Sequence, residues 1–369
     1  MLTKSESRLN KYLTGLEKKH QPIVYIGLIS FVLFIILLFT TRLDPNCRYL
    51  GRYYELLANN PFDYSYNNPV AFRILTPLIS FLLGLKGKGI IITNLLITYI
   101  FIGVIFGYYK NQLGNNFWGL FVTLAGITSL ALSTSVHCGG YADILTYLII
   151  FLIWVKQHNR WYFLLLFGLS LFNRESIIFL LPWFLLLYFK NHHFRFGDTI
   201  QLMIGLLIIF VLYYLFRSHI SAHQEIKYSL SYYLDPILNK PFDIFLITVK
   251  FHMLGFLSVL RFLWAVPLLA IYYYFSRKEN LKGLSIVLII ILSYLQLFIA
   301  QDTSRMFTLS YIVLFLPIVD LYNSNFLKFK RWFPILVLLN LIAPQIYTAG
   351  HNIEIWHNFL IRLLSDSFI

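Results

Sequence analysis

The sequence predicts an all-α fold, a polytopic bundle of transmembrane helices with about eleven spans, in a range of about 9–12. Of the 369 residues, 58% are hydrophobic and only 12% are charged, whereas a soluble domain carries about 25% charged residues. Apolar runs close to the roughly 20 residues that a helix needs to cross a bilayer recur along the chain. These observations exclude an ordinary soluble enzyme, a disordered protein and a disulfide-stapled secreted module.

The first apolar run covers Ile23–Thr41 and follows a polar, basic leader at residues 1–22. No small-residue cleavage site follows this run, so we interpret it as a retained anchor and not as a signal peptide. The leader places four apolar side chains on one helical face: Leu9, Tyr12, Leu13 and Leu16. An amphipathic helix of this kind is expected to lie on the cytoplasmic surface of the membrane.

Further spans complete the predicted transmembrane domain at residues 23–349. They are expected at about 90–109, 117–136, 141–155, 161–173, 176–189, 199–216, 253–275, 283–300, 306–322 and 333–349. Between the first two spans, Ala71–Leu85 is apolar but short and contains Pro77, which predicts an interfacial or re-entrant helix. Residues 350–369 are expected to form a short external tail.

The positions of the charges orient this bundle. With a cytoplasmic N-terminus, basic residues such as Arg277, Lys278 and Lys282 gather in the cytoplasmic loops, as the positive-inside rule requires. Most acidic residues, and the long loops within 42–89 and 217–243, then lie outside. We attribute the net charge of +14 to cytoplasmic loops and lipid headgroups, and no nucleic-acid partner is predicted. A bacterial inner membrane and an endoplasmic reticulum would give the same pattern.

Ionisable residues at the outer ends of the spans are the candidate functional groups, because charge inside a membrane is costly. In the first loop, Asp44 could accept a proton from an attacking hydroxyl, and Arg48 and Arg52 are spaced to share a helix face suited to a phosphate. Arg73 enters an apolar segment between two prolines. The alternatives are a solvated loop and arginines that extend to the lipid headgroups.

The turn from His137 to Asp143 contains two adjacent glycines and lies between two predicted spans. His137 and Asp143 could serve acid–base chemistry or bind a metal, and the glycines would let the backbone approach a ligand. A tight turn whose aspartate caps the next helix is the alternative. One histidine and one aspartate are too few for a zinc site, so no metal or other cofactor is predicted.

Two short polar motifs interrupt long apolar runs: Asn173-Arg174-Glu175, and the segment from Asp302 to Arg305. Each alone is compatible with a self-neutralising turn between two helices. Together with the first loop and the glycine turn, they fall on one face of the bundle. The sequence therefore predicts an outward-facing polar cavity under the two long loops.

In this organisation the chain resembles the GT-C superfamily of integral-membrane glycosyltransferases, which includes protein mannosyltransferases and bacterial aminoarabinose transferases. The resemblance covers about residues 20–190 best, with a weaker likeness at Asp302–Arg305. Asp44 occupies the position of the acidic residue that follows the first helix in that superfamily, and Ala71–Leu85 is similar to its interfacial helix. Many members have paired acids in this loop, so Glu55 or Asp63 would have to supply a second one.

The resemblance implies transfer of a sugar from a polyprenyl- or dolichyl-phosphate donor to a glycan, lipid or protein acceptor on the outer or lumenal face. Asp44 would be the general base. The departing lipid phosphate would be bound by Arg73, Arg174 and Arg305. Acidic residues would orient those arginines or bind sugar hydroxyls, namely Asp143, Glu175 and Asp302.

Three other function classes remain open. An envelope-polysaccharide polymerase or ligase would also use outward arginine-rich loops to bind lipid-linked glycans. A transporter of lipid-linked glycans is favoured by Arg261, deep in an apolar run, although no internal repeat is evident. A membrane scaffold is the third class. Cys47 and Cys138 would both lie outside, where either a disulfide or two free thiols would fit.

Overall fold

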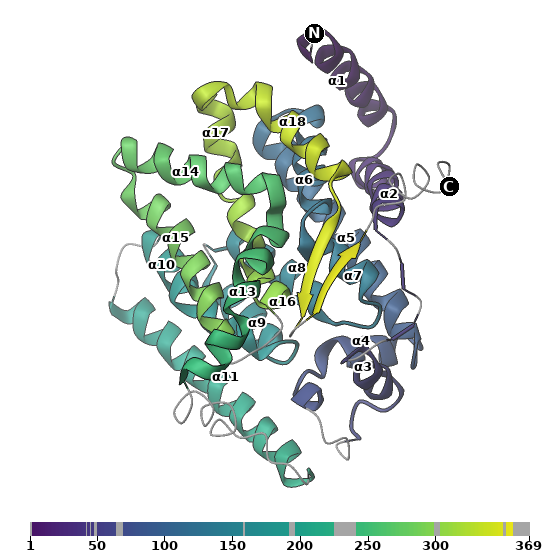
Figure 1. Ribbon diagram of the computed structural model, residues 1–369, viewed down its shortest axis with the longest axis vertical. Helices are drawn as coiled ribbons and strands as arrows, with labels where there is room; N and C mark the ends of the chain where they lie inside the picture. The colour runs from purple at the N-terminus through teal and green to yellow at the C-terminus, as the bar shows by residue number, and fades with distance from the viewer. Residues whose placement is uncertain are drawn as a thin grey trace.

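The computed structural model describes residues 2–41, 43–44, 46–47, 50–63, 69–157, 159–191, 196–224, 241–298, 303–349 and 352–356. These residues form a bundle of helices joined by short turns, with one antiparallel β-hairpin lying across it (Figure 1). The predicted helical class is thus confirmed for the bundle.

The elements of the first half are α1 (Leu2–Lys19), α2 (Pro22–Thr40), α3 (Leu50–Asn59), the 3₁₀ helix η1 (Pro69–Phe72), α4 (Leu75–Leu82), α5 (Gly89–Leu113), α6 (Asn116–Ile127), α7 (Leu130–His137), α8 (Asp143–Val155), α9 (Arg160–Leu171), η2 (Glu175–Leu180), α10 (Leu181–Asn191) and α11 (Phe196–Ala222). Asparagine side chains define two of the helix starts. Asn115 caps α6 and Asn159 caps α9, each by accepting hydrogen bonds from the backbone N–H groups of the first turn.

The second half contains α13 (Pro241–Leu260), η3 (Arg261–Trp264), α14 (Ala265–Ser276), α15 (Asn280–Leu295), η4 (Gln296–Phe298), α16 (Thr303–Phe307), η5 (Thr308–Leu314), α17 (Ile318–Ser324), η6 (Phe326–Lys328), α18 (Phe329–Ile342), β1 (Gln345–Ala349) and β2 (Asn352–Trp356). In Figure 1, α1, α17 and α18 lie at one end of the bundle, and α3 and α4 lie at the opposite end.

Among the described residues, five helical segments are long and apolar enough to cross a membrane: Pro22–Thr40, Gly89–Leu113, Gly197–Ala222, Phe251–Ser276 and Ser304–Ser324. The bent pair α6–α7, with 58° between its helices, makes a sixth if it counts as one span. This is consistent with a multi-pass membrane protein, but the predicted count of about eleven is not confirmed. Several expected spans are shorter helices. For example, α8 has 13 residues, or about 20 Å, against a hydrocarbon core of about 30 Å.

The C-terminal hairpin departs from the all-α prediction. The span expected at 333–349 ends at Ile342, because the next residue leaves the helical conformation and Pro344 cannot continue a helix. Strands β1 and β2 then pair antiparallel, with Tyr347 opposite Glu354. The segment predicted to be an external tail therefore supplies a strand, and β-branched and aromatic residues in both strands suit this pairing.

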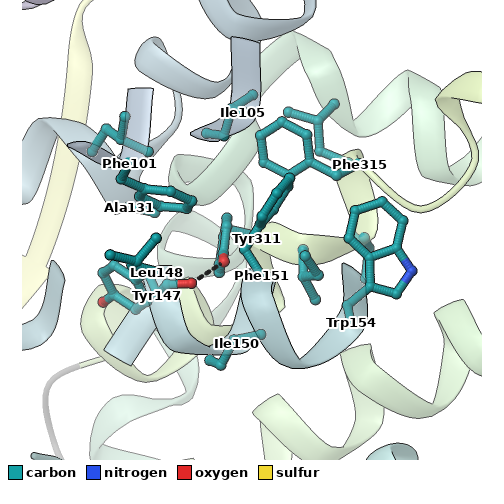
Figure 2. Close-up of a cluster of buried hydrophobic side chains, with 14 of the residues drawn as sticks. Phe101, Ile105, Ala131, Tyr147, Leu148, Ile150, Phe151, Trp154, Tyr311 and Phe315 are labelled. Carbon is teal, nitrogen blue, oxygen red and sulfur yellow. Dashed lines mark hydrogen bonds between the residues drawn. The ribbon is translucent and has the colours of Figure 1, made fainter. Parts of the chain in front are cut away.

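Aromatic side chains fill the core where α5, α8 and η5 meet. Figure 2 shows Phe101, Tyr147, Phe151, Tyr311 and Phe315 gathered there. The rings of Phe101 and Phe151 lie 5.7 Å apart, and the Tyr311 hydroxyl donates to the Tyr147 carbonyl. This packing fixes the start of α8 relative to the chain that leads from α16 into η5.

The chain between the first two long helices folds onto the start of α5. Helix α4 packs between α3 and α5, and a left-handed Gly87 (φ +56°) lies in the turn that joins α4 to α5. With eight residues, α4 is about 12 Å long and is too short to cross a membrane. Its interfacial or re-entrant placement stays a prediction. The backbone N–H of Leu75 donates to the Phe172 carbonyl at 3.0 Å, which ties α4 to the end of α9.

Candidate active site

The break between α9 and η2, Asn173-Arg174-Glu175, sends three polar side chains to three neighbouring elements. The Asn173 amide is buried and joins α4 to α8. Its Oδ1 accepts from the Thr76 hydroxyl at 2.6 Å, and its Nδ2 donates to the Ala142 carbonyl and the Thr146 hydroxyl at 2.8 Å each. Asn173 thereby fixes the position from which the next two side chains diverge.

Glu175 forms a bidentate ion pair with Arg73. The Nε and Nη2 of Arg73 donate to the two carboxylate oxygens at 2.9 and 2.7 Å, and its Nη1 donates to the Tyr54 hydroxyl at 3.3 Å. Burial alone would raise the pKa of the Glu175 carboxyl, but the charge and hydrogen bonds of Arg73, with help from Arg217, lower this pKa to about 2. The guanidinium of Arg217 lies 4.4 Å above the Phe72 ring.

Asp143, at the start of α8, contacts two further arginines. Arg305 Nη2 donates to Asp143 Oδ1 at 2.9 Å, and Arg305 Nε donates to Oδ2. Arg174 Nη1 lies 3.4 Å from the same Oδ1. The fully buried Arg174 also donates to the Tyr147 hydroxyl at 3.3 Å and to the Arg305 carbonyl at 3.1 Å, while its Nε has no hydrogen-bond partner among the described residues. One carboxylate therefore compensates two guanidinium groups.

These two ion-pair groups lie close enough for Arg73 to interact electrostatically with both Asp143 and Arg305. We call the five residues the charged cluster: Arg73, Asp143, Arg174, Glu175 and Arg305. Three guanidinium groups face two carboxylates, so the cluster carries one surplus positive charge. A buried surplus charge favours the binding of an anion, and guanidinium groups suit phosphate oxygens in particular.

Asp44 lies against the turn that leads into Asp143. It is half-buried in the connection between α2 and α3, and its Oδ1 accepts from the backbone N–H of Asn46 at 3.0 Å. Its carbonyl oxygen is so close to Gly139 that an added Cβ there would lie 2.3 Å away. Gly140 has a φ of +91°, which favours glycine. Because these glycines lack a Cβ, the backbone of the first loop can pack directly against the turn.

The other candidate residues have different surroundings. His137 ends α7 and stacks on Trp356 of β2, with ring centroids 3.8 Å apart. Arg52 is exposed on α3 and lines an open groove of about 1010 Å³ beside Lys88. Arg48 and Asp302 lie outside the described residues. Within the described part of the chain, no three His, Cys, Asp or Glu side chains group as metal ligands.

No disulfide joins Cys47 to Cys138 in the described part of the chain. Cys47 is buried against Gly140, where an added Cβ would lie 2.8 Å from the Cys47 Sγ. Burial, together with the nearby Glu55 carboxylate, raises the pKa of the Cys47 thiol to about 12. Cys138 is half-buried. Of the two alternatives that fit the sequence, the described structure does not have the disulfide.

Several residues that hold the charged cluster were not among the sequence candidates: Thr76, Thr146, Tyr147 and Arg217. Tyr147 could have been predicted from the sequence, because it follows Asp143 by four residues and shares its helix face. Arg217 could also have been found, because it directly follows the apolar run at residues 199–216. The two threonines could not have been predicted, since a threonine in an apolar helix commonly hydrogen-bonds to the backbone of its own helix.

Comparison with known proteins adds no family assignment. No protein-family model matches the chain, and no curated protein sequence matches it. The inference of function therefore depends on the charged cluster and on the position of Asp44.

Proposed function

We propose that this chain is an integral-membrane glycosyltransferase that moves a sugar from a polyprenyl- or dolichyl-phosphate donor to an acceptor on the outer or lumenal face. One observation carries the proposal. The loop that bears Asp44 packs on the glycine turn leading into Asp143, which is bound to two of the three arginines of the charged cluster. A loop that bears a carboxylate and packs on the turn leading into a cluster with surplus positive charge suits a reaction that needs both a base and a phosphate site.

The proposed reaction is a single displacement at the anomeric carbon. The acceptor oxygen forms a bond to that carbon, the bond from the carbon to the phosphate oxygen breaks, and Asp44 takes the hydroxyl proton. The lipid phosphate leaves with the electron pair and needs cations more than a general acid. The surplus charge of the cluster supports phosphate binding there, as does the Nε of Arg174, which has no hydrogen-bond partner within the described structure.

Arg261, the residue that most favours a transporter, has partners that explain its charge without a solute. Its guanidinium donates to the carbonyls of Thr128 and Ala343, which cap the C-terminal ends of α6 and α18. Each helix C-terminus carries about half a negative charge, so two of them balance one arginine. Arg261 therefore adds no support for transport.

A vesicle assay separates transfer from transport. Vesicles containing the full chain would receive undecaprenyl-phosphate-linked tritiated hexoses and pentoses together with a membrane extract as the source of acceptors. We expect label in a covalent glycan, lipid or protein product. Movement of label across the bilayer without any covalent product would contradict the enzyme and favour the transporter.

A further inference from the structure

The acidic side chains described on α1 both face the protein. Glu6 accepts a hydrogen bond from Trp118 Nε1 at 2.8 Å. Glu17 accepts from Asn116 Nδ2 at 2.9 Å and from Lys110 Nζ. Lys110 compensates the charge of Glu17, and the bond to Trp118 holds Glu6 toward the bundle, so neither acid lies on the outward side of α1.

The apolar residues of α1 divide between the protein and the surroundings. Leu13 is 5% exposed and belongs to the core, with Leu16 packed against it. Leu9 and Tyr12 are 39% and 65% exposed. The apolar face of α1 therefore does not lie on a membrane as a whole. Its Leu13 and Leu16 pack against the bundle.

The cations of α1 lie on the side opposite to its acids. All those whose side chains are described are exposed: Arg8, Lys11, Lys18 and Lys19. Their spacing of three, seven and one residues places them on one helical face with Tyr12. Gly15 lies in the middle of that face, with no atom within 4 Å of an added Cβ. Nothing in the described structure covers this face.

A second basic segment lies nearby, from Leu327 to Arg331, where η6 leads into α18. Leu327 is 62% exposed, and Lys328 and Arg331 are exposed beside it. The link to α1 runs through Trp118, whose ring lies 5.1 Å from that of Tyr322. Lys330 Nζ lies 3.9 Å above the same Tyr322 ring. Figure 1 likewise shows α1, α17 and α18 at one end of the bundle.

We infer that this basic face, formed by Arg8, Lys11, Lys18, Lys19, Lys328 and Arg331, binds the phosphate headgroups of anionic phospholipids. Only two residues separate α1 from α2, a candidate span that begins at Pro22. The connection therefore holds α1 at the level of the headgroups of the adjoining leaflet. Exposed Leu9, Tyr12 and Leu327 can insert between those headgroups while the cations contact the phosphates.

The test is lipid selectivity of the full chain in phosphatidylcholine vesicles, measured by electron spin resonance with spin-labelled phosphatidylglycerol or phosphatidylcholine. Each cation near an anionic surface contributes about fivefold to association at low salt. We expect a severalfold preference for phosphatidylglycerol, which weakens in about 0.5 M NaCl because salt screens surface charge. Absence of a preference, or a preference that salt leaves unchanged, overturns the proposal.

The Lys11→Gln/Lys18→Gln variant removes two charges that are exposed on α1. Its phosphatidylglycerol preference should fall severalfold. The matched control is Lys86→Gln/Lys88→Gln. It removes two exposed lysines that precede α5, at the end of that helix away from α1, and it should keep most of the preference. Equal losses in both variants, or no loss in the first, would show that the basic face is not the binding surface. Neither outcome depends on glycosyl transfer.

Discussion

Among single residues, Asp143 has the most demanding position, because it compensates two arginines where little water reaches. Its side chain is 8% exposed and that of Arg174 is fully buried. Removing one partner of a buried ion pair leaves an uncompensated charge, whereas an exposed pair contributes little to stability. The stability of the bundle should therefore depend strongly on this carboxylate.

We predict that Asp143→Asn lowers the free energy of unfolding by about 3–5 kcal/mol. The control is Asp198→Asn, because Asp198 is 43% exposed and pairs with Arg160 at 3.2 Å. This control should cost less than about 1 kcal/mol. Unfolding of the full chain in detergent measures both changes, and equal small losses would contradict the arrangement around Asp143.

The Glu175 carboxyl predicts a dependence of stability on pH. Its pKa in the folded protein, about 2, lies below its ordinary value of 4.5, so the unfolded chain binds a proton more readily than the folded one. The stabilisation is complete above the ordinary value and is lost as the pH falls through the folded value.

The stability difference between the wild type and Glu175→Gln should accordingly be constant near pH 7 and should shrink from about pH 4.5 downward. Unfolding followed at several pH values in detergent measures this difference. A difference that stays the same down to about pH 3 would show that the Arg73–Glu175 pair does not stabilise the fold in this way.

At the scale of elements, the first loop and the glycine turn form one unit. A Cβ on Gly139 would lie 2.3 Å from the Asp44 carbonyl oxygen, so Gly139→Ala must displace the loop that carries the proposed base. We expect a loss of about 1–3 kcal/mol in stability and a larger relative loss of glycosyl transfer. Thermal unfolding and the transfer assay measure the two effects.

The matched control is Gly15→Ala in α1, where an added Cβ meets no atom within 4 Å. Alanine favours a helix by about 0.5–1 kcal/mol over glycine, so this variant should be as stable as the wild type or more stable. If Gly139→Ala kept both the stability and the transfer activity of the wild type, the loop would not depend on the turn.

Elements that follow a strong local pattern could be predicted from the sequence, and those set by packing could not. The apolar runs predict α2 and α5, and the polar break at Asn173-Arg174-Glu175 lies where the chain leaves α9. The hairpin was missed because Gln345–Ala349 continues an apolar run, and only pairing with β2 makes it a strand. Apolarity likewise does not distinguish a short buried helix such as α8 from a span.

At the scale of the whole molecule, the charges gather at the two ends of the bundle. The first loop, with α3 and α4, lies at one end, and the basic face of α1 lies at the other (Figure 1). The proposed catalytic and lipid-binding regions therefore lie far apart on the bundle. The orientation in which the basic face meets the cytoplasmic leaflet stays a prediction of the positive-inside rule.

The sequence also predicts that the polar breaks meet on one face, but it does not predict their pairing. Arg73 and Glu175 are 102 residues apart, and Asp143 and Arg305 are 162 apart. Which carboxylate meets which arginine depends on the packing of the aromatic core, which places α8 beside α16. Asp143 and Glu175 were predicted to orient these arginines or to bind sugar hydroxyls, and the structure shows which arginines each of them contacts.

The most direct test of the proposed function compares Asp44→Asn with the wild type in sugar transfer from an undecaprenyl-phosphate donor and, on the same membranes, in binding of undecaprenyl phosphate. We predict that transfer falls by at least about 10²-fold, because the general base is lost. Binding of the lipid should persist, because the arginines of the charged cluster are intact. Asp198→Asn should retain both properties. Transfer by Asp44→Asn at the wild-type rate would contradict the role of Asp44 and, with it, the proposed mechanism.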